Sequence, residues 1–258
     1  WDRQRLRLKE VYFFPVEDDN TEKRMFDSGL LHLTSTVPTN DIPRLKTSRP
    51  DILHIDDYLG TYFFRLNVTR PPLNNPLVRK ALNYATDRRA IVDKVTLGDQ
   101  KPATAYVPPG FEGYVSPVEL RHDPALARSS LAQAGFPGGQ GFPQLRLLFN
   151  TSEGHRKVAE ALVAMWNDVL GINLQLENKE WKVYLDAQTH LDYDISRSGW
   201  IGDYMDPVTF LEMFTTGNGN NDTGWSNPRD DDLISRAFRS PDEAGHFCVL
   251  RKAEAILL

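Results

Sequence analysis

The sequence is poor in the residues on which several common functional sites depend. Cys248 is the only cysteine among 258 residues, which excludes an internal disulfide framework and a cysteine-built zinc site. The six histidines share no metal-ligand spacing. The patterns G-x-S-x-G, the Walker loop and H-E-x-x-H are absent as well. We therefore expect no metal, no cofactor and no catalytic residues.

Charge of one sign and long apolar runs are also lacking. The net charge is -5 with both signs mixed, which argues against a nucleic-acid partner. No run approaches the roughly 18 apolar residues of a membrane span. The chain opens with "WDRQRLRLKE", which is no signal peptide, and stops at "AEAILL", inside an amphipathic helix pattern. We expect a fragment of a longer protein.

Two kinds of local pattern divide the chain. Before position 70, β-branched and aromatic residues predict short strands, with a helix over 20–29 that begins at Asn20. From position 76 onward, helices and strands alternate, which favours an α/β layer. The predicted strands are 11–16, 31–37, 52–56, 61–68, 144–150, 172–178 and 193–199. The predicted helices are 76–95, 123–135, 155–171, 180–188, 207–214, 229–239 and 246–258.

The segment "SRSGWIGDYMDP" (196–207) carries more than a connector needs. It joins a predicted strand to a predicted helix and places Arg197, Trp200 and Asp203 on a turn loosened by glycines. Loops often carry function, so ligand contact and simple packing both stay open for this turn. Asp203 and Asp206 also leave open a carboxylate-dependent hydrolase, although solvated carboxylates are common on turns.

The tryptophans differ in what their spacing predicts. Trp166 shares one stripe of a predicted helix with Val158 and Leu162, which predicts a core position. Trp181 lies at a strand-to-helix junction and Trp200 lies between glycines, so burial and ligand contact remain alternatives for both. His155, at the start of a helix, is expected at the surface or as a capping residue.

Long segments resemble a known family. They are "PPLNNPLVRKALNYATDRRAIVDKVTLGDQKPATAYVPPG", "LLFNTSEGHRKVAEALVAMWNDVLGINLQLENKEWKVYLD" and "DISRSGWIGDYMDPVTFLEMFTTGNGNND". They are similar to the oligopeptide-binding proteins of bacterial peptide importers, in extracellular solute-binding protein family 5. The likeness extends over essentially the whole chain.

The resemblance implies a type II periplasmic-binding-protein-like α/β fold, in which two lobes close around a peptide. Residues 1–67 would be a segment of the first lobe up to the hinge. Residues 68–258 would be most of the second lobe, a mixed sheet flanked by helices. It also implies a monomeric, non-enzymatic protein, periplasmic or lipid-anchored outside the cytoplasmic membrane, that serves an inner-membrane ABC permease.

The same resemblance implies roles for individual residues. Asp203 would receive the free α-amino group of the peptide. The backbone beside Gly199, Trp200 and Ile201 would pair with the peptide main chain. The remaining implied positions are side-chain pockets at Trp200 and Trp181, contacts to the peptide carboxylate from Arg197 and His155, and polar lining from Asn150 and Asn220.

Some positions depart from the family pattern. Gln188 and Ile201 stand where close relatives carry arginine and cysteine, and Arg65 and Phe63 stand where some relatives are acidic and phenolic. These departures leave peptide length and side-chain preference open. A relative of the same fold that binds murein peptide, a nickel complex or a sugar remains an alternative.

Overall fold

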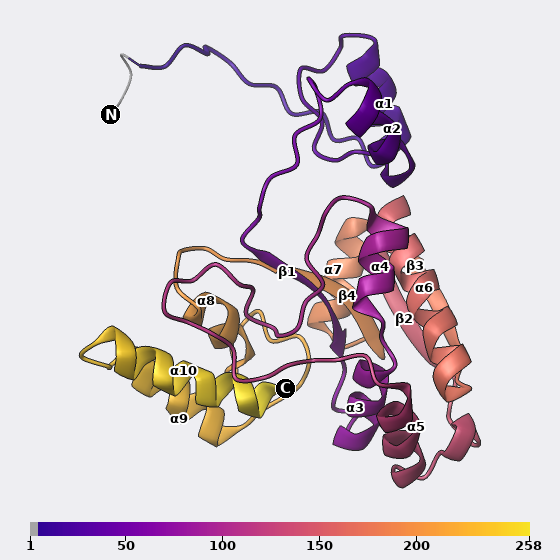
Figure 1. The fold of residues 1–258 in the computed structure, drawn as a ribbon, viewed down its shortest axis with the longest axis vertical. Coiled ribbons are helices and arrows are strands. Elements are labelled where there is room, and N and C mark those ends of the chain that lie inside the picture. The colour runs from indigo at the N-terminus through magenta and orange to yellow at the C-terminus, as the bar shows by residue number, and fades with distance from the viewer. Residues whose placement is uncertain (1–4) are drawn as a thin grey trace.

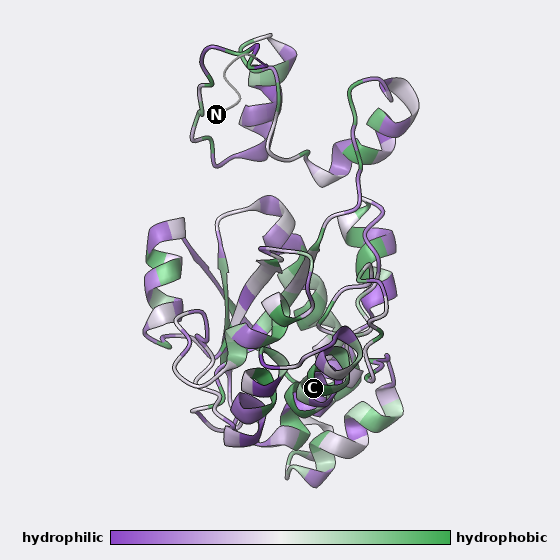
Figure 2. Ribbon diagram, turned by 90° about the vertical axis from the view of Figure 1, so that its left-hand side faces the viewer, coloured by the Kyte–Doolittle hydropathy of each residue, from purple (hydrophilic) through white to green (hydrophobic). Residues whose placement is uncertain are grey.

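The computed structural model describes residues 5–258 and shows a main body with a smaller helical segment at one end (Figure 1). The helical segment contains α1 (Asp19–Asp27) and α2 (Ile42–Ser48). Figure 2, turned by 90°, shows the same separation. The two parts touch at several points. At one of them, the Lys157 ammonium lies 3.1 Å from the Thr39 hydroxyl and 3.0 Å from the Asn40 side-chain oxygen.

A four-stranded mixed sheet organises the main body. Its strands are β1 (Gly60–Leu66), β2 (Leu145–Asn150), β3 (Leu174–Lys179) and β4 (Ile195–Ile201), in the order β1-β4-β2-β3. β2 runs parallel to β3 and β4, whereas β1 runs antiparallel to β4, with Thr61 opposite Trp200. The predicted mixed α/β fold is confirmed, and so is the predicted strand over 61–68.

Helices cover both faces of this sheet. Leu147 points to a core shared with α3, α5 and α6, whereas Leu148 packs against Tyr184 of α7 on the opposite face. A second core joins the loop around Tyr106 to α8, α9 and α10. The helices of the main body are α3 (Pro76–Tyr84), α4 (Arg88–Ile91), α5 (Pro124–Gln133), α6 (Glu153–Leu170), α7 (Trp181–Thr189), α8 (Val208–Leu211), α9 (Pro228–Ala237) and α10 (Glu243–Leu257).

The three strands predicted over 11–16, 31–37 and 52–56 are wrong, since these ranges contain no strand. β-branched and aromatic residues favour a strand only when a neighbouring strand and a core are present to pack against. Here Tyr12 and Phe13 are 73% and 91% exposed. The division of the chain at residue 67 stays a prediction, and β1, which precedes it, pairs with β4 of the main body.

Two helix predictions also need correction. The helix expected over 76–95 is interrupted after Tyr84, where Asp87 caps the separate helix α4, and a π-helical segment (Val92–Thr96) follows. The first helix is capped by Asp18, whose carboxylate accepts from the Thr21 N–H at 2.7 Å, and not by Asn20. Helix α2 was not expected, because it is only seven residues long. The predicted helix starts at Asn75 and Asp123 are confirmed.

Trp166 lies in the core as predicted, with 3% of its surface exposed. Its indole N–H donates to the Leu82 carbonyl at 3.0 Å and to the Thr86 hydroxyl at 3.1 Å. These bonds fix α6 against the interruption between α3 and α4. Within residues 5–258, no helix combines the length and the apolar character that crossing a bilayer requires.

Candidate functional site

The carboxyl ends of the parallel strands bring most of the predicted site residues to one edge of the sheet. β2 ends at Asn150, β3 is followed by Trp181, and β4 ends with Trp200 and Ile201. Open α/β sheets bind ligands at this edge, because the loops that leave the strand ends converge there. The fold thus collects residues from three segments that are far apart in the sequence.

Arg197 is the centre of a polar cluster at this edge. Its guanidinium donates to the Asn150 side-chain oxygen at 3.4 Å and lies 5.0 Å from the centre of the Tyr62 ring. The Tyr62 hydroxyl lies 3.3 Å from Nδ1 of His155, in the first turn of α6. We call Arg197, Asn150, Tyr62 and His155 the Arg197 cluster. The Arg197 Nε is buried and has no hydrogen-bond partner among the described residues.

The electrostatics of the cluster keep its histidine neutral. Burial, together with a smaller contribution from the nearby Arg197 cation, lowers the pKa of His155 to about 3. A neutral imidazole can accept a hydrogen bond at Nδ1, which matches the Tyr62 hydroxyl placed there. Arg197 is therefore the positive charge that this cluster presents at neutral pH.

Helix α7 holds the backbone of Arg197 in place. The Gln188 amide donates to the Arg197 carbonyl at 3.1 Å and to the Ser196 hydroxyl at 2.9 Å, and the Tyr184 hydroxyl donates to the same carbonyl. Gln188 is 4% exposed, so its position gives it a structural role. Trp181, which is half exposed, stacks on Tyr184 with the ring centres 5.5 Å apart.

The last residues of β4 have a strand on one side only. β1 pairs with β4 along its whole length, whereas β2 pairs only with Ile195 and Ser196. Gly199 and Ile201 are exposed in this segment. Trp200 is partly buried against the second core, and its indole N–H has no partner within residues 5–258. The outer half of β4 is therefore an edge at which an extended chain can add hydrogen bonds.

Asp203 and Asp206 lie on the turn after β4 but in different surroundings. Asp203 is exposed, and its carboxylate makes no hydrogen bond or ion pair with the part of the chain that the structure describes. Its N–H donates to the Thr209 hydroxyl at 3.1 Å. Asp206 is engaged, because its two oxygens lie 3.0 Å from Nε2 of His246. Asp203 is thus the acceptor that remains available on the turn.

One predicted residue does not join the others. Asn220 is exposed in the loop between α8 and α9, and its backbone N–H donates to the side chain of Asn218 at 2.9 Å. Sequence reasoning also missed Tyr62 and Tyr184. Tyr62 stands beside Phe63 in a predicted strand, where alternation places the two on opposite faces, and that pattern is the signal that could have singled it out.

Arg65 and Phe63, which depart from the family pattern, have their side chains packed against other parts of the main body. Arg65 is buried in an ion pair with Asp222. Phe63 packs edge-to-face on Tyr106, with the ring centres 5.1 Å apart. Both side chains therefore contact other residues of the main body.

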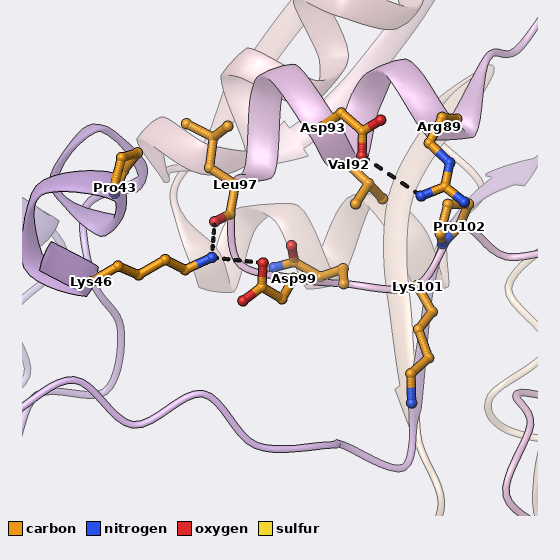
Figure 3. Close-up of a pocket in the computed structure, with 10 residues that line it drawn as sticks. Pro43, Lys46, Arg89, Val92, Asp93, Leu97, Asp99, Lys101 and Pro102 are labelled. Carbon is orange, nitrogen blue, oxygen red and sulfur yellow. Dashed lines mark hydrogen bonds and ion pairs between the residues drawn. The ribbon is translucent and has the colours of Figure 1, made fainter. Parts of the chain in front are cut away.

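A separate cavity of about 590 Å³ lies between α2 and the π-helical segment (Figure 3). Its cations are paired: the Lys46 ammonium lies 2.6 Å from the Asp99 carboxylate, and the Arg89 guanidinium lies 3.8 Å from that of Asp93. None of the predicted site residues lines it. The residues that the structure describes also contain no group of three or more side chains suited to hold a metal ion.

A mixed sheet flanked by helices, with most of the predicted site residues at its carboxyl edge, is the arrangement expected for a lobe of a periplasmic-binding-type protein. The chain belongs to the family described as bacterial extracellular solute-binding proteins, family 5 Middle, whose profile matches residues 1–222. This membership confirms the family predicted from the sequence, which is a family of non-enzymatic solute-binding proteins.

Relatives and solved structures agree with this assignment. The chain is 37% identical to the oligopeptide-binding protein OppA of Bacillus subtilis, over 100% of the chain and 49% of that protein. It matches the murein tripeptide-binding protein MppA of Escherichia coli with a TM-score of 0.89, at 30% identity, over 95% of this chain and 49% of that one. It also matches Haemophilus influenzae OppA, solved in complex with RPPGFSPFR, with a TM-score of 0.85 at 32% identity. This match covers 94% of this chain and 49% of that one. The chain therefore spans about half the length of these proteins.

Proposed function

We propose that this chain is the peptide-gripping part of the substrate-binding component of an ABC peptide importer. The observation that carries the proposal is the position of Asp203. Its carboxylate is exposed and unpartnered among residues 5–258, next to the half of β4 that has a strand on one side only. A peptide laid along β4 would bring its free α-amino group to this carboxylate.

The chemistry of a peptide N-terminus matches this arrangement. An ammonium group that leaves water needs an opposite charge, because an unpaired buried charge is very costly. The backbone of Gly199, Trp200 and Ile201 would add hydrogen bonds to the peptide main chain. Such strand addition gives affinity that does not depend on peptide sequence. Asp203 and β4 together would recognise what all unblocked peptides share.

The Arg197 cluster would meet the other end of certain peptides. Arg197 is its positive charge, and a guanidinium binds a carboxylate through two hydrogen bonds. Because the distance between the two peptide ends depends on the number of residues, this contact would favour particular lengths. Trp200 and Trp181 would line side-chain pockets, and Asn220 would contribute polar lining.

Residues 1–67 would belong to the first of two lobes. Their exposed apolar side chains support this, since exposed patches of this kind mark surfaces that another part of the protein covers. They include Leu6, Leu8, Val11, Tyr12, Phe13 and Phe14. The relatives are about twice as long as this chain, which is the length that two lobes would need. Residues 1–258 alone should then bind a tripeptide much more weakly than the full-length protein. Equal affinity would contradict the division into lobes.

The partners and the location follow from the same proposal. The protein would act as a monomer outside the cytoplasmic membrane, in the periplasm or anchored by a lipid, and would deliver peptides to an inner-membrane ABC permease. The names of relatives such as the periplasmic OppA of Escherichia coli support this location.

A second candidate ligand is a murein peptide. The TM-score of 0.89 to the murein tripeptide-binding protein supports it. A murein tripeptide released from its sugar chain also carries a free amine, so Asp203 would serve both ligands. The chemical identity of the bound peptide therefore separates the two candidates.

Mass spectrometry of the ligands that co-purify with the full-length protein tests the proposal. We expect unblocked peptides that remain intact during incubation. Recovery of murein fragments alone would favour the second candidate. Cleavage of added peptides or glycosides by the pure protein would overturn the binding function and return the hydrolase alternative.

A further inference from the structure

The turn that carries Asp203 is held by a chain of contacts that begins at Asp206. The Asp206 carboxylate accepts from the Val208 N–H at 2.8 Å, at the start of α8. The Asp206 carbonyl accepts from the Thr209 N–H at 3.2 Å. The hydroxyl of Thr209, which is fully buried, accepts in turn from the N–H of Asp203. The backbone of Asp203 thus depends on where Asp206 is fixed.

His246 of α10 fixes Asp206 from the other side. Its Nε2 lies 3.0 Å from each oxygen of the Asp206 carboxylate, and its Nδ1 lies 2.9 Å from the carbonyl of Ala237, the last residue of α9. The imidazole is 16% exposed. One side chain therefore joins two helices of the second core to the turn after β4.

Both ring nitrogens of His246 face acceptors, which only the imidazolium form satisfies. A neutral imidazole has one N–H, so it would direct a lone pair at either the Asp206 carboxylate or the Ala237 carbonyl. The carboxylates facing the ring among the described residues are Asp206 from the turn and Glu243 from α10. Burial acts to lower the pKa of His246, but the hydrogen bonds to Asp206 and Ala237 outweigh it and raise the pKa above its ordinary value.

We propose that protonated His246 is a positioning residue for peptide capture: it holds the Asp203 turn in its binding conformation through a clamp that ties Asp206 to α9 and α10. The inference rests on the proposed grip of Asp203 on the peptide amine. The direction of the pH dependence follows from the raised pKa of His246. The clamp is complete below pH 6.5 and is lost as the pH rises through the folded-state value. Peptide affinity therefore declines over that range.

The test is the ratio of peptide affinities between wild type and His246→Gln in the full-length protein, measured by calorimetry from pH 5.5 to 8.5. The peptide amine loses its proton at about pH 7.7–8.0, and this loss weakens binding to both proteins. The ratio of the two affinities removes the effect. At pH 6 we expect His246→Gln to bind about fivefold more weakly or worse, the lower end of typical coupling between sites. The ratio should fall toward one as the pH rises through the folded-state pKa of His246.

Asp206→Asn provides an independent second variant. It should show the same loss at pH 6, and the double variant should bind no more weakly than either single variant, because both changes break one clamp. His122→Gln is the matched control, since His122 also faces an aspartate, Asp87, at 3.7 Å, but does not contact the turn. Its affinity ratio should stay near one at every pH.

Two results would overturn the inference. A loss of equal size at pH 6 and pH 8.5 would mean that His246 has only a structural role. An unchanged affinity at pH 6 would mean that the turn does not need the clamp. Asp203→Asn, run in parallel, separates this inference from the proposed function. If it binds weakly while the His246→Gln ratio stays flat, the amine grip stands and the clamp fails. If it binds like the wild type, both fail.

Discussion

Arg197 and Asn150 are 47 positions apart in the sequence, yet the guanidinium of the first donates to the side-chain oxygen of the second at 3.4 Å. The contact joins the last residue of β2 to the third residue of β4, just beyond the two positions at which these strands pair. It places a fixed positive charge at the edge where the resemblance implied binding of a peptide carboxylate. The position of this charge leads directly to a prediction about peptide length.

Arg197→Ala should weaken binding mainly for the peptide lengths whose carboxylate reaches the Arg197 cluster. A hydrogen bond to a charged group contributes about 1.5–3 kcal/mol, so we expect roughly a tenfold loss or more for those lengths. A titration series from dipeptide to pentapeptide measures it. Arg156→Ala is the control, because Arg156 is an exposed arginine of α6. A uniform loss at every length would point to a structural role for Arg197.

Trp200→Ala should weaken binding of nearly all peptides, because Trp200 would line a pocket next to the common backbone contacts. Tryptophans at the centre of an interface often contribute about 2 kcal/mol or more, which is roughly thirtyfold in Kd. The same peptide series measures this loss, and Trp200→Phe should recover part of it. If only one or two peptides lose affinity, the tryptophan selects a particular side chain.

The neutral state of His155 predicts an acid-sensitive contribution to stability. Its pKa is about 3 in the folded protein and near 6.5 when unfolded, so the unfolded state binds the proton first. The contribution of neutral His155 to folding stability is therefore complete above pH 6.5 and is lost as the pH falls toward 3. When the pH is lowered from 7.5 to 4.5, the melting temperature should therefore fall less for His155→Gln than for the wild type. The exposed His190→Gln should follow the wild type. Parallel curves for all three proteins would contradict this reasoning.

Asp230 predicts the opposite pH dependence. It is 2% exposed, and burial together with the neighbouring Asp231 raises its pKa to about 7. The folded state therefore holds the proton more tightly, and stability is lost as the pH rises from about 4 to 7. Asp230→Asn removes the charge and should raise the free energy of unfolding at pH 8 by about 1–3 kcal/mol, because a buried unpaired carboxylate costs more than a buried amide.

Urea unfolding at pH 8 and pH 4.5 measures the effect of Asp230→Asn, which should shrink at the lower pH. Asp232→Asn is the matched control, because Asp232 is exposed on the same helix and pairs with Arg236 at 3.6 Å. A loss of stability in Asp230→Asn at pH 8 would show that the carboxylate has a favourable partner.

Local signals in the sequence were sufficient for the capped helices and for the strands of the sheet. Asn75 and Asp123 cap their helices because each side chain reaches an N–H within its own first turn. Gly171 ends α6 because it adopts the left-handed conformation that glycine tolerates. The strand predictions before position 60 failed because a strand needs partners, which composition does not reveal.

The same limit applies to the site. Its strand-end residues could be placed through the family resemblance. The support from Gln188 and Tyr184 depends on α7 packing against β4, and no short-range pattern indicates that contact. The role of Asp206 likewise depends on His246, which lies 40 positions away.

The central claim is that Asp203 grips the free amine of a peptide. Calorimetry of one tripeptide and its N-acetylated form, with full-length wild type and Asp203→Asn, tests it most directly. Removing one member of a buried ion pair costs about 3–5 kcal/mol, so either change should raise Kd more than a hundredfold. Acetylation should cost Asp203→Asn little more, because its partner charge is already gone. Equal binding of the free and acetylated peptides by the wild type would contradict the account.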